Sequence, residues 1–167
     1  MGIRRAAFEQ TAEPIDAHGW NGRSQLLLNV SAHQRRVPVA EELDAETLAF
    51  AHQMFDLARS GDVAAMSDYL NNGLPPNLTN DKGDSLLILA AYHGHLDAVK
   101  VLLDKGADTA RVNDRGQTAL AAAVFRSATP IVDALMVAGA DPHMGGPSAV
   151  EVAKFFDLRE MSARLQP

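Results

Sequence analysis

One stretch of this chain recurs with an offset of about 33 residues, and this repetition limits the possible folds more than any other feature. Residues 80–107 read NDKGDSLLILAAYHGHLDAVKVLLDKGA, and residues 113–140 read NDRGQTALAAAVFRSATPIVDALMVAGA. The two stretches match at Asn, Gly, Leu, Ala and Val positions, and each is followed by Asp. A repeat of this length is typical of solenoids, in which each short unit packs only on its neighbours.

Each unit predicts two short helices joined by a tight turn. Ser85 precedes an apolar run, where its hydroxyl can cap free N–H groups, so a first helix is expected over residues 85–92. Gly94 tolerates the positive φ of a tight reversal. A second helix is expected over residues 96–104, and Gly106 ends it as a left-handed cap.

The second helices predict the core between units. Leu102 and Leu135 occupy the same inward position of successive units, and a single helix pair has too little apolar surface to be stable alone. Thr118 repeats the capping hydroxyl of the first helix. In the third unit, Thr129-Pro130 predicts a helix start with Thr129 as the cap and Pro130 at the first helical position.

The stretch DKGDSLLILAAYHGHLDAVKVLLDKGAD resembles an ankyrin repeat, and residues 116–123 resemble the G-x-T-A-L-x-x-A motif of that family. The proline that usually follows the capping residue is replaced by Leu86 and Ala119. The resemblance covers about residues 45–165 and implies an all-α ankyrin-repeat solenoid with three full repeats and a shortened C-terminal repeat. The expected units of a domain over residues 41–167 are about 44–79, 80–112, 113–145 and 146–165, and an N-terminal extension over residues 1–40 precedes them.

A helix longer than the others is expected over residues 44–59, before Gly61. Its apolar stripe is wider than one core face needs, whereas the end unit of a solenoid should present a polar outer face. We therefore expect the apolar patch of the N-terminal extension, Leu26–Val30, to cover this helix. The alternatives are that a partner covers the helix, or that the extension is a loose tail.

Composition and charge exclude several classes of function. The 167-residue chain has no Cys and a formal net charge of −6, which argues against disulfides, thiolate metal sites and broad binding of nucleic acid or anionic membranes. No apolar run approaches the roughly 20 residues of a membrane span. The start, MGIRRAAFEQ, lacks the apolar region of a secretory signal. We therefore expect a cytoplasmic protein.

No group of residues predicts catalysis, a cofactor or a metal. The sequence contains no phosphate-binding loop, dinucleotide-binding motif or nucleophile elbow. His93 and His95 flank Gly94, but no third ligand stands at a metal-site spacing. The ankyrin resemblance implies that His95 bonds backbone groups instead. We expect a protein that is not an enzyme and has no catalytic, cofactor-binding or metal-binding residues.

The resemblance also implies a binding surface on the concave side, formed by finger-like loops and the exposed side of the first helices. Tyr92, Phe125 and Phe155 fall at one position of successive units, which predicts a ladder of aromatic rings, and aromatic and Arg side chains are typical binding anchors. Alternatively, Phe155 and Phe156 belong in part to the terminal core, and Phe125 fills space beside the turn at Ser127. The predicted partner-binding residues are Arg59, Lys82, Asp84, Tyr92, His93, Arg115, Gln117, Phe125, Arg126 and Phe155.

These features predict a non-catalytic protein–protein interaction module, monomeric by itself, whose protein partner the sequence does not identify. One alternative is a structural subunit that associates with itself through the apolar helix at residues 44–59. Another is a small-ligand-binding protein or enzyme with a site between the N-terminal extension and the groove.

Overall fold

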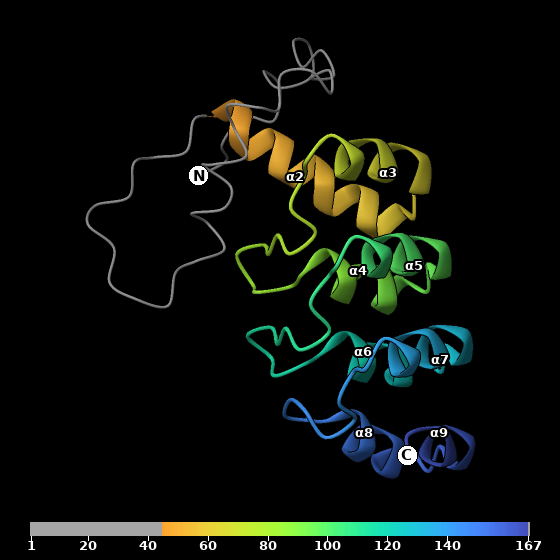
Figure 1. Cartoon of the computed structure of the whole chain (residues 1–167). Coiled ribbons are helices and arrows are strands. Elements are labelled where there is room, and N and C mark those ends of the chain that lie inside the picture. The colour runs from red at the N-terminus through yellow and green to blue at the C-terminus, as the bar shows by residue number, and fades with distance from the viewer. Residues whose placement is uncertain (1–44, 167) are drawn as a thin grey trace, which may run out of the picture.

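Residues 45–166, the described part of the computed structural model, form a stack of four helix pairs (Figure 1). The pairs are α2 (Ala45–Ser60) with α3 (Val63–Asn71), α4 (Leu86–His93) with α5 (Leu96–Asp104), α6 (Ala119–Phe125) with α7 (Thr129–Val137), and α8 (Ala149–Phe155) with α9 (Arg159–Arg164). The only β-structure within this range is isolated bridges. The prediction of an all-α solenoid is confirmed. None of these helices has both the length and the apolar character needed to cross a membrane.

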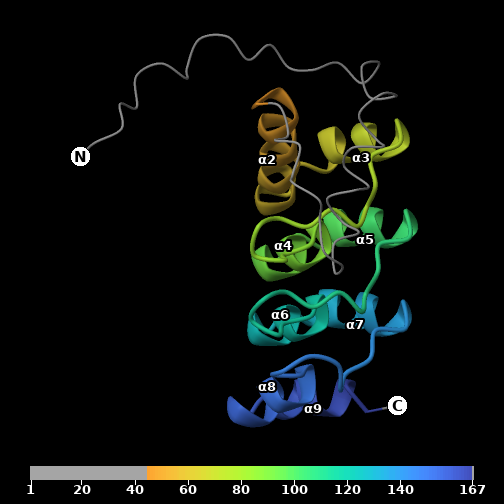
Figure 2. The same ribbon diagram turned by 90° about the vertical axis from the view of Figure 1, so that its left-hand side faces the viewer.

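The helices form two layers. The first helices of the pairs contact one another in chain order along one side of the stack, and the second helices do so along the other (Figure 2). The loops that precede α4, α6 and α8 project to the same side of the stack (Figure 1). We call these three loops the fingers. They stand beside the first helices, which is where the binding residues are predicted.

Side-chain caps fix the start of three of the first helices. The hydroxyls of Ser85 and Thr118 each accept a hydrogen bond at 3.1 Å from the amide three residues later, as predicted. Ser148 caps α8 in the same way, and the carboxylate of Glu151 accepts a hydrogen bond at 2.8 Å from the Ser148 amide, which completes a capping box. Such caps stabilise a helix by about 1 kcal/mol each.

A residue with positive φ follows the first helix of each pair, and the second helix begins two residues later. Gly94 has φ of 82°, and Ser127 holds the equivalent place in the third pair with φ of 52°. Because Ser127 sets the start of α7, Thr129 is already the first helical residue and Ala128 is the N-cap, without a side-chain hydrogen bond. The prediction that Thr129 caps α7 is therefore wrong, and Pro130 lies one position further into the helix.

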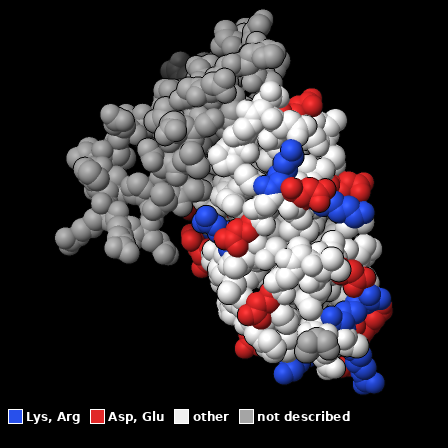
Figure 3. All heavy atoms as spheres, viewed as in Figure 1, with Lys and Arg blue, Asp and Glu red and all other residues white. Residues whose placement is uncertain are grey.

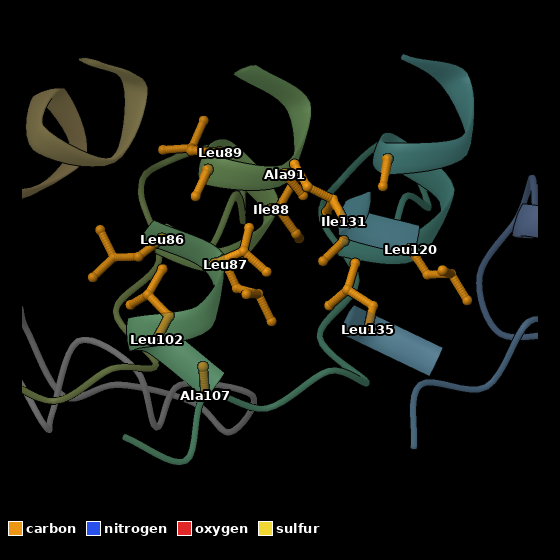
Figure 4. Close-up of a cluster of buried hydrophobic side chains, with 14 of the residues drawn as sticks. Leu86, Leu87, Ile88, Leu89, Ala91, Leu102, Ala107, Leu120, Ile131 and Leu135 are labelled. Atoms are coloured by element: carbon orange, nitrogen blue, oxygen red, sulfur yellow. The ribbon is translucent and has the colours of Figure 1, made fainter. Parts of the chain in front are cut away.

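One hydrophobic core runs through the stack, and Figure 4 shows the part of it around α4 to α7. Leu102 of α5 and Leu135 of α7 are both fully buried, as predicted from their equivalent positions. Leu86, Leu87 and Leu120, from the first helices, complete the same cluster. Burying a leucine contributes roughly 1.5–3 kcal/mol, so the stacking of neighbouring pairs is the main source of stability for helices this short.

Helix α2 buries its apolar stripe against two neighbours, α3 and α4. Phe50 meets Tyr69 of α3 edge-on, with ring centroids 5.4 Å apart, and Met54 is buried, while Leu48 keeps 43% of its surface exposed. Contacts with two neighbours account for much of the width of the stripe. The predicted cover of this helix by Leu26–Val30 lies outside the described residues.

Candidate binding groove

Asparagine side chains shape the first two fingers. In the loop before α4, Asn80 Oδ1 accepts hydrogen bonds from the amides of Lys82 and Asp84, both at 2.9 Å. Asn113 makes the same pair of bonds in the loop before α6, at 3.0 and 2.9 Å. In this pattern the asparagine side chain accepts hydrogen bonds from nearby backbone amides and so stabilises the turn. It places Lys82 and Arg115 at equivalent points of the two fingers.

Backbone hydrogen bonds join the fingers to one another. The amide of Asp114 donates to the carbonyl of Lys82 at 3.1 Å, and the amide of Gly146 donates to the carbonyl of Gly116 at 2.8 Å. A Cβ added to Gly116 would collide with the Gly146 carbonyl oxygen, so glycine is required for this close approach. The three fingers are therefore held at fixed positions relative to one another.

Asp84, one of the predicted partner-binding residues, is buried between two fingers, with 5% of its surface exposed. Its carboxylate accepts hydrogen bonds from the side-chain amides of Asn113 at 2.6 Å and Asn80 at 3.3 Å, and it pairs with Arg115 at 3.5 Å. Gln117 is half-buried beside it. Asp84 thus holds the fingers together and presents little surface to a partner.

A hollow of about 260 Å³ opens among the fingers, the end of α2 and the helix α4. Four groups with positive or titratable nitrogen line it: Arg59 from the end of α2, Lys82 and Arg115 from the fingers, and His93 from α4. We call this hollow the cationic pocket. It brings together seven of the ten predicted partner-binding residues, namely Arg59, Lys82, Asp84, Tyr92, His93, Arg115 and Gln117.

The surroundings of His93 reflect the positive charges at this end of the groove. The pKa of His93 is lowered from the ordinary value of 6.5, first by burial and then by electrostatic interactions with His95, Arg59 and Arg126. Its ring stacks on that of His95, with centroids 6.3 Å apart. The Nε2 of His95 lies 2.7 Å from the Arg59 carbonyl oxygen, to which it donates. The prediction that His95 bonds a backbone group is confirmed.

Aromatic rings continue the groove from the cationic pocket toward the last pair. The rings of Tyr92 and Phe125 are parallel within 7°, with centroids 6.2 Å apart, and the Arg126 guanidinium carbon lies 5.6 Å from the Tyr92 centroid. Stacked aromatics and an arginine over a ring are each worth roughly 0.5–1.5 kcal/mol. These three predicted residues are therefore held in one surface.

The ladder prediction is wrong at its last position. Phe125 meets Phe156 rather than Phe155, with centroids 5.6 Å apart, and Phe155 packs on Phe156 at 5.0 Å. Phe156 follows the last residue of α8 just as Arg126 follows that of α6, and both reach back to the ring of the preceding pair. Phe155 is 82% exposed and is therefore no part of the terminal core. We call Tyr92, Phe125, Phe155 and Phe156 the aromatic strip.

A second, larger hollow was not predicted. It has a volume of about 600 Å³ and lies beside α2, where Leu48 and Phe55 line it, and it shares Arg59 and Asn80 with the cationic pocket. The wide apolar stripe of the expected first helix was its only signal in the sequence. The repeat spacing could not predict this hollow, because no stretch of matching sequence precedes the first repeat.

Neither the groove nor the rest of the described chain contains a cluster suited to a metal. Between residues 45 and 166, no three His, Asp or Glu side chains lie close enough to hold an ion together. Over the described part of the face seen in Figure 3, acidic and basic side chains are interspersed.

The stacked helix pairs and the joined fingers define a class of protein, the helical repeat domain, in which short units stack into one continuous core. Within that class, the chain belongs to the ankyrin repeat family: a family model of three ankyrin repeats matches residues 54–145, more than half of the chain. An ankyrin repeat protein of Pseudomonas aeruginosa is 60% identical over 60 residues. That match covers 36% of this chain and 35% of the relative, so the two are alike over about a third of their lengths.

Proposed function

We propose that this chain is a non-catalytic protein-binding module, located in the cytoplasm, whose groove holds a partner protein. Ankyrin repeats generally mediate protein–protein interaction. The observation that carries the proposal is the aromatic strip, in which Phe125, Phe155 and Phe156 keep 43%, 82% and 50% of their surface exposed. Exposed apolar groups that gather in one patch are typical of interaction sites.

The rigidity of the groove supports the same function. The fingers are joined by hydrogen bonds, and the aromatic rings contact one another. Association then costs little ordering of side chains and loops, which favours affinity. No catalytic group, cofactor or metal enters the proposal, and the site imagined between the N-terminal extension and the groove lies outside the described residues.

The test measures the affinity of a native partner, isolated with the full chain as bait, for matched variants. Tyr92→Ala and Phe125→Ala should each weaken binding by about 2 kcal/mol, as for other aromatic hot spots. The control variants Asp97→Ala and Lys100→Ala change exposed residues of α5, in the opposite layer, and should bind normally. Loss of binding in the control pair, with the aromatic pair unaffected, would place the interface on the other face.

A further inference from the structure

The positive side chains of the cationic pocket have spare capacity to bind an anion. Among the described residues Lys82 has no ion-pair partner. Arg115 reaches Asp84 only at 3.5 Å, and its side chain is 66% exposed. Arg59 pairs with Asp56 at 2.7 Å and is 42% exposed. A guanidinium has five N–H donors, so a single carboxylate leaves most of them available.

The carboxylates near the pocket leave some of the donors of these cations free. The carboxylate of Asp84 is buried and shared among Asn113, Asn80 and Arg115, and Asp81 is the exposed carboxylate that lines the pocket. The pKa of His93 is lowered first by burial and then by neighbours that include Arg59, and both effects disfavour its charged form. An incoming carboxylate can therefore meet the ammonium of Lys82 and the remaining donors of Arg59 and Arg115.

The aromatic strip begins where the cationic pocket ends, because Tyr92 belongs to both. From there the rings of Phe125 and then Phe156 follow at centroid distances of 6.2 and 5.6 Å. An extended segment of about four residues spans these two steps at roughly 3.3 Å per residue. One short segment can thus contact the cations at one end and the exposed phenylalanines at the other.

On the basis of the protein-binding function above, we propose that the occupant of this groove is an acidic segment of a partner protein. Its Asp or Glu side chains enter the cationic pocket, and a large apolar side chain about four residues away packs on the aromatic strip. The carboxylate sets the position of the segment through charge-assisted hydrogen bonds. The apolar side chain supplies most of the affinity through burial against Phe125 and Phe156.

The probe for this proposal is a display library of random short peptides, selected on the full chain and on two charge-reversed variants. The first variant carries Lys82→Glu and Arg115→Glu in the pocket. The matched control carries Lys100→Glu and Lys105→Glu, which make the same charge change on exposed residues of α5 and its cap. Thermal melts first confirm that both variants fold.

The wild-type chain and the control should enrich peptides with Asp or Glu about four residues from Phe, Trp or Leu. The pocket variant should reduce the acidic enrichment at least tenfold. A Phe125→Ala, Phe156→Ala variant should instead lose the preference for large apolar side chains and retain that for acids. Selected peptides without acidic side chains, or an acidic preference that survives Lys82→Glu and Arg115→Glu, would overturn the proposal.

Two other occupants have distinct signatures. Trp20 is the single tryptophan of the chain. If the N-terminal segment occupied the groove, Lys82→Glu with Arg115→Glu would shift the Trp20 emission without any peptide. If a second copy did, the protein would form a dimer that Phe125→Ala with Phe156→Ala dissociates. Either result would overturn the proposal that an acidic segment of a partner protein occupies the groove.

Failure of this proposal can be told apart from failure of the protein-binding function. A native partner that depends on Tyr92 and Phe125 but tolerates Lys82→Glu and Arg115→Glu would retain the function and reject the acidic segment. A partner indifferent to all four residues would reject both.

Discussion

At the scale of single residues, two side chains that the sequence predicts as binding residues have different roles in the groove. Asp84 and Lys82 stand two positions apart in one finger. Asp84 is buried and accepts two side-chain amides, whereas Lys82 is exposed at the pocket. The difference arises because Asn113, from the next unit, reaches across to Asp84. Such a contact between units depends on the geometry of the loops, which repeat alignment does not give. Alignment alone therefore placed both residues among the binding candidates.

His93 gives a residue-scale prediction about pH. Its pKa in the folded chain is lowered, so the unfolded chain binds the proton more readily. The stability linked to His93 is therefore fully present above about pH 6.5 and is lost as pH falls through the lowered folded value. An NMR titration of the His93 ring should show a midpoint below 6.5, and Arg126→Ala should raise it.

Lys100→Ala is the control for this titration, since Lys100 is not among the groups that affect His93. A His93 midpoint at or above the ordinary value would mean that neither burial nor the neighbouring arginines lower the pKa of this ring.

At the scale of elements, the sequence predicted the parts that repeat and missed those that depend on neighbours. The caps at Ser85 and Thr118 follow from local hydrogen bonding, and the helix of residues 96–104 follows from apolar spacing. Thr129 was misassigned because the positive φ of Ser127, a non-glycine residue, could not be seen in the sequence. Phe156 was left out of the predicted binding residues because its ring contacts the preceding pair, a relation that only the stacked structure fixes.

The finger joint at Gly116 gives an element-scale prediction. Gly116 and Gly106 have nearly equal φ, 78° and 79°. A Cβ added at Gly116 would collide with the Gly146 carbonyl, whereas one added at Gly106 would have no neighbour within 4 Å. Both Gly→Ala changes cost about 1–2 kcal/mol for the left-handed backbone. Only Gly116→Ala also forces the fingers apart. Its loss of unfolding free energy in urea should therefore exceed that of Gly106→Ala, and equal losses would show that the fingers are not tightly joined.

At the scale of the whole molecule, stability is expected to depend on contacts between neighbouring pairs. Leu102 is fully buried in the continuous core, so Leu102→Ala should cost roughly 2–5 kcal/mol. Because each pair stacks only on its neighbours, the pairs on either side of α5 should lose stability with it. Urea titration measures the total, and a loss well below 1 kcal/mol would contradict the burial of Leu102.

Hydrogen exchange at the bonds between fingers can also report the order in which the helix pairs separate. The amides of Asp114 and Gly146 each donate to the preceding finger, so each exchanges with solvent hydrogen only when its own joint opens. If the stack separates from the C-terminal pair inward, Gly146 exchanges before Asp114. If all pairs open together, the two amides show the same free energy of opening once their intrinsic exchange rates are taken into account. Two backbone positions can therefore distinguish stepwise from concerted opening without any substitution.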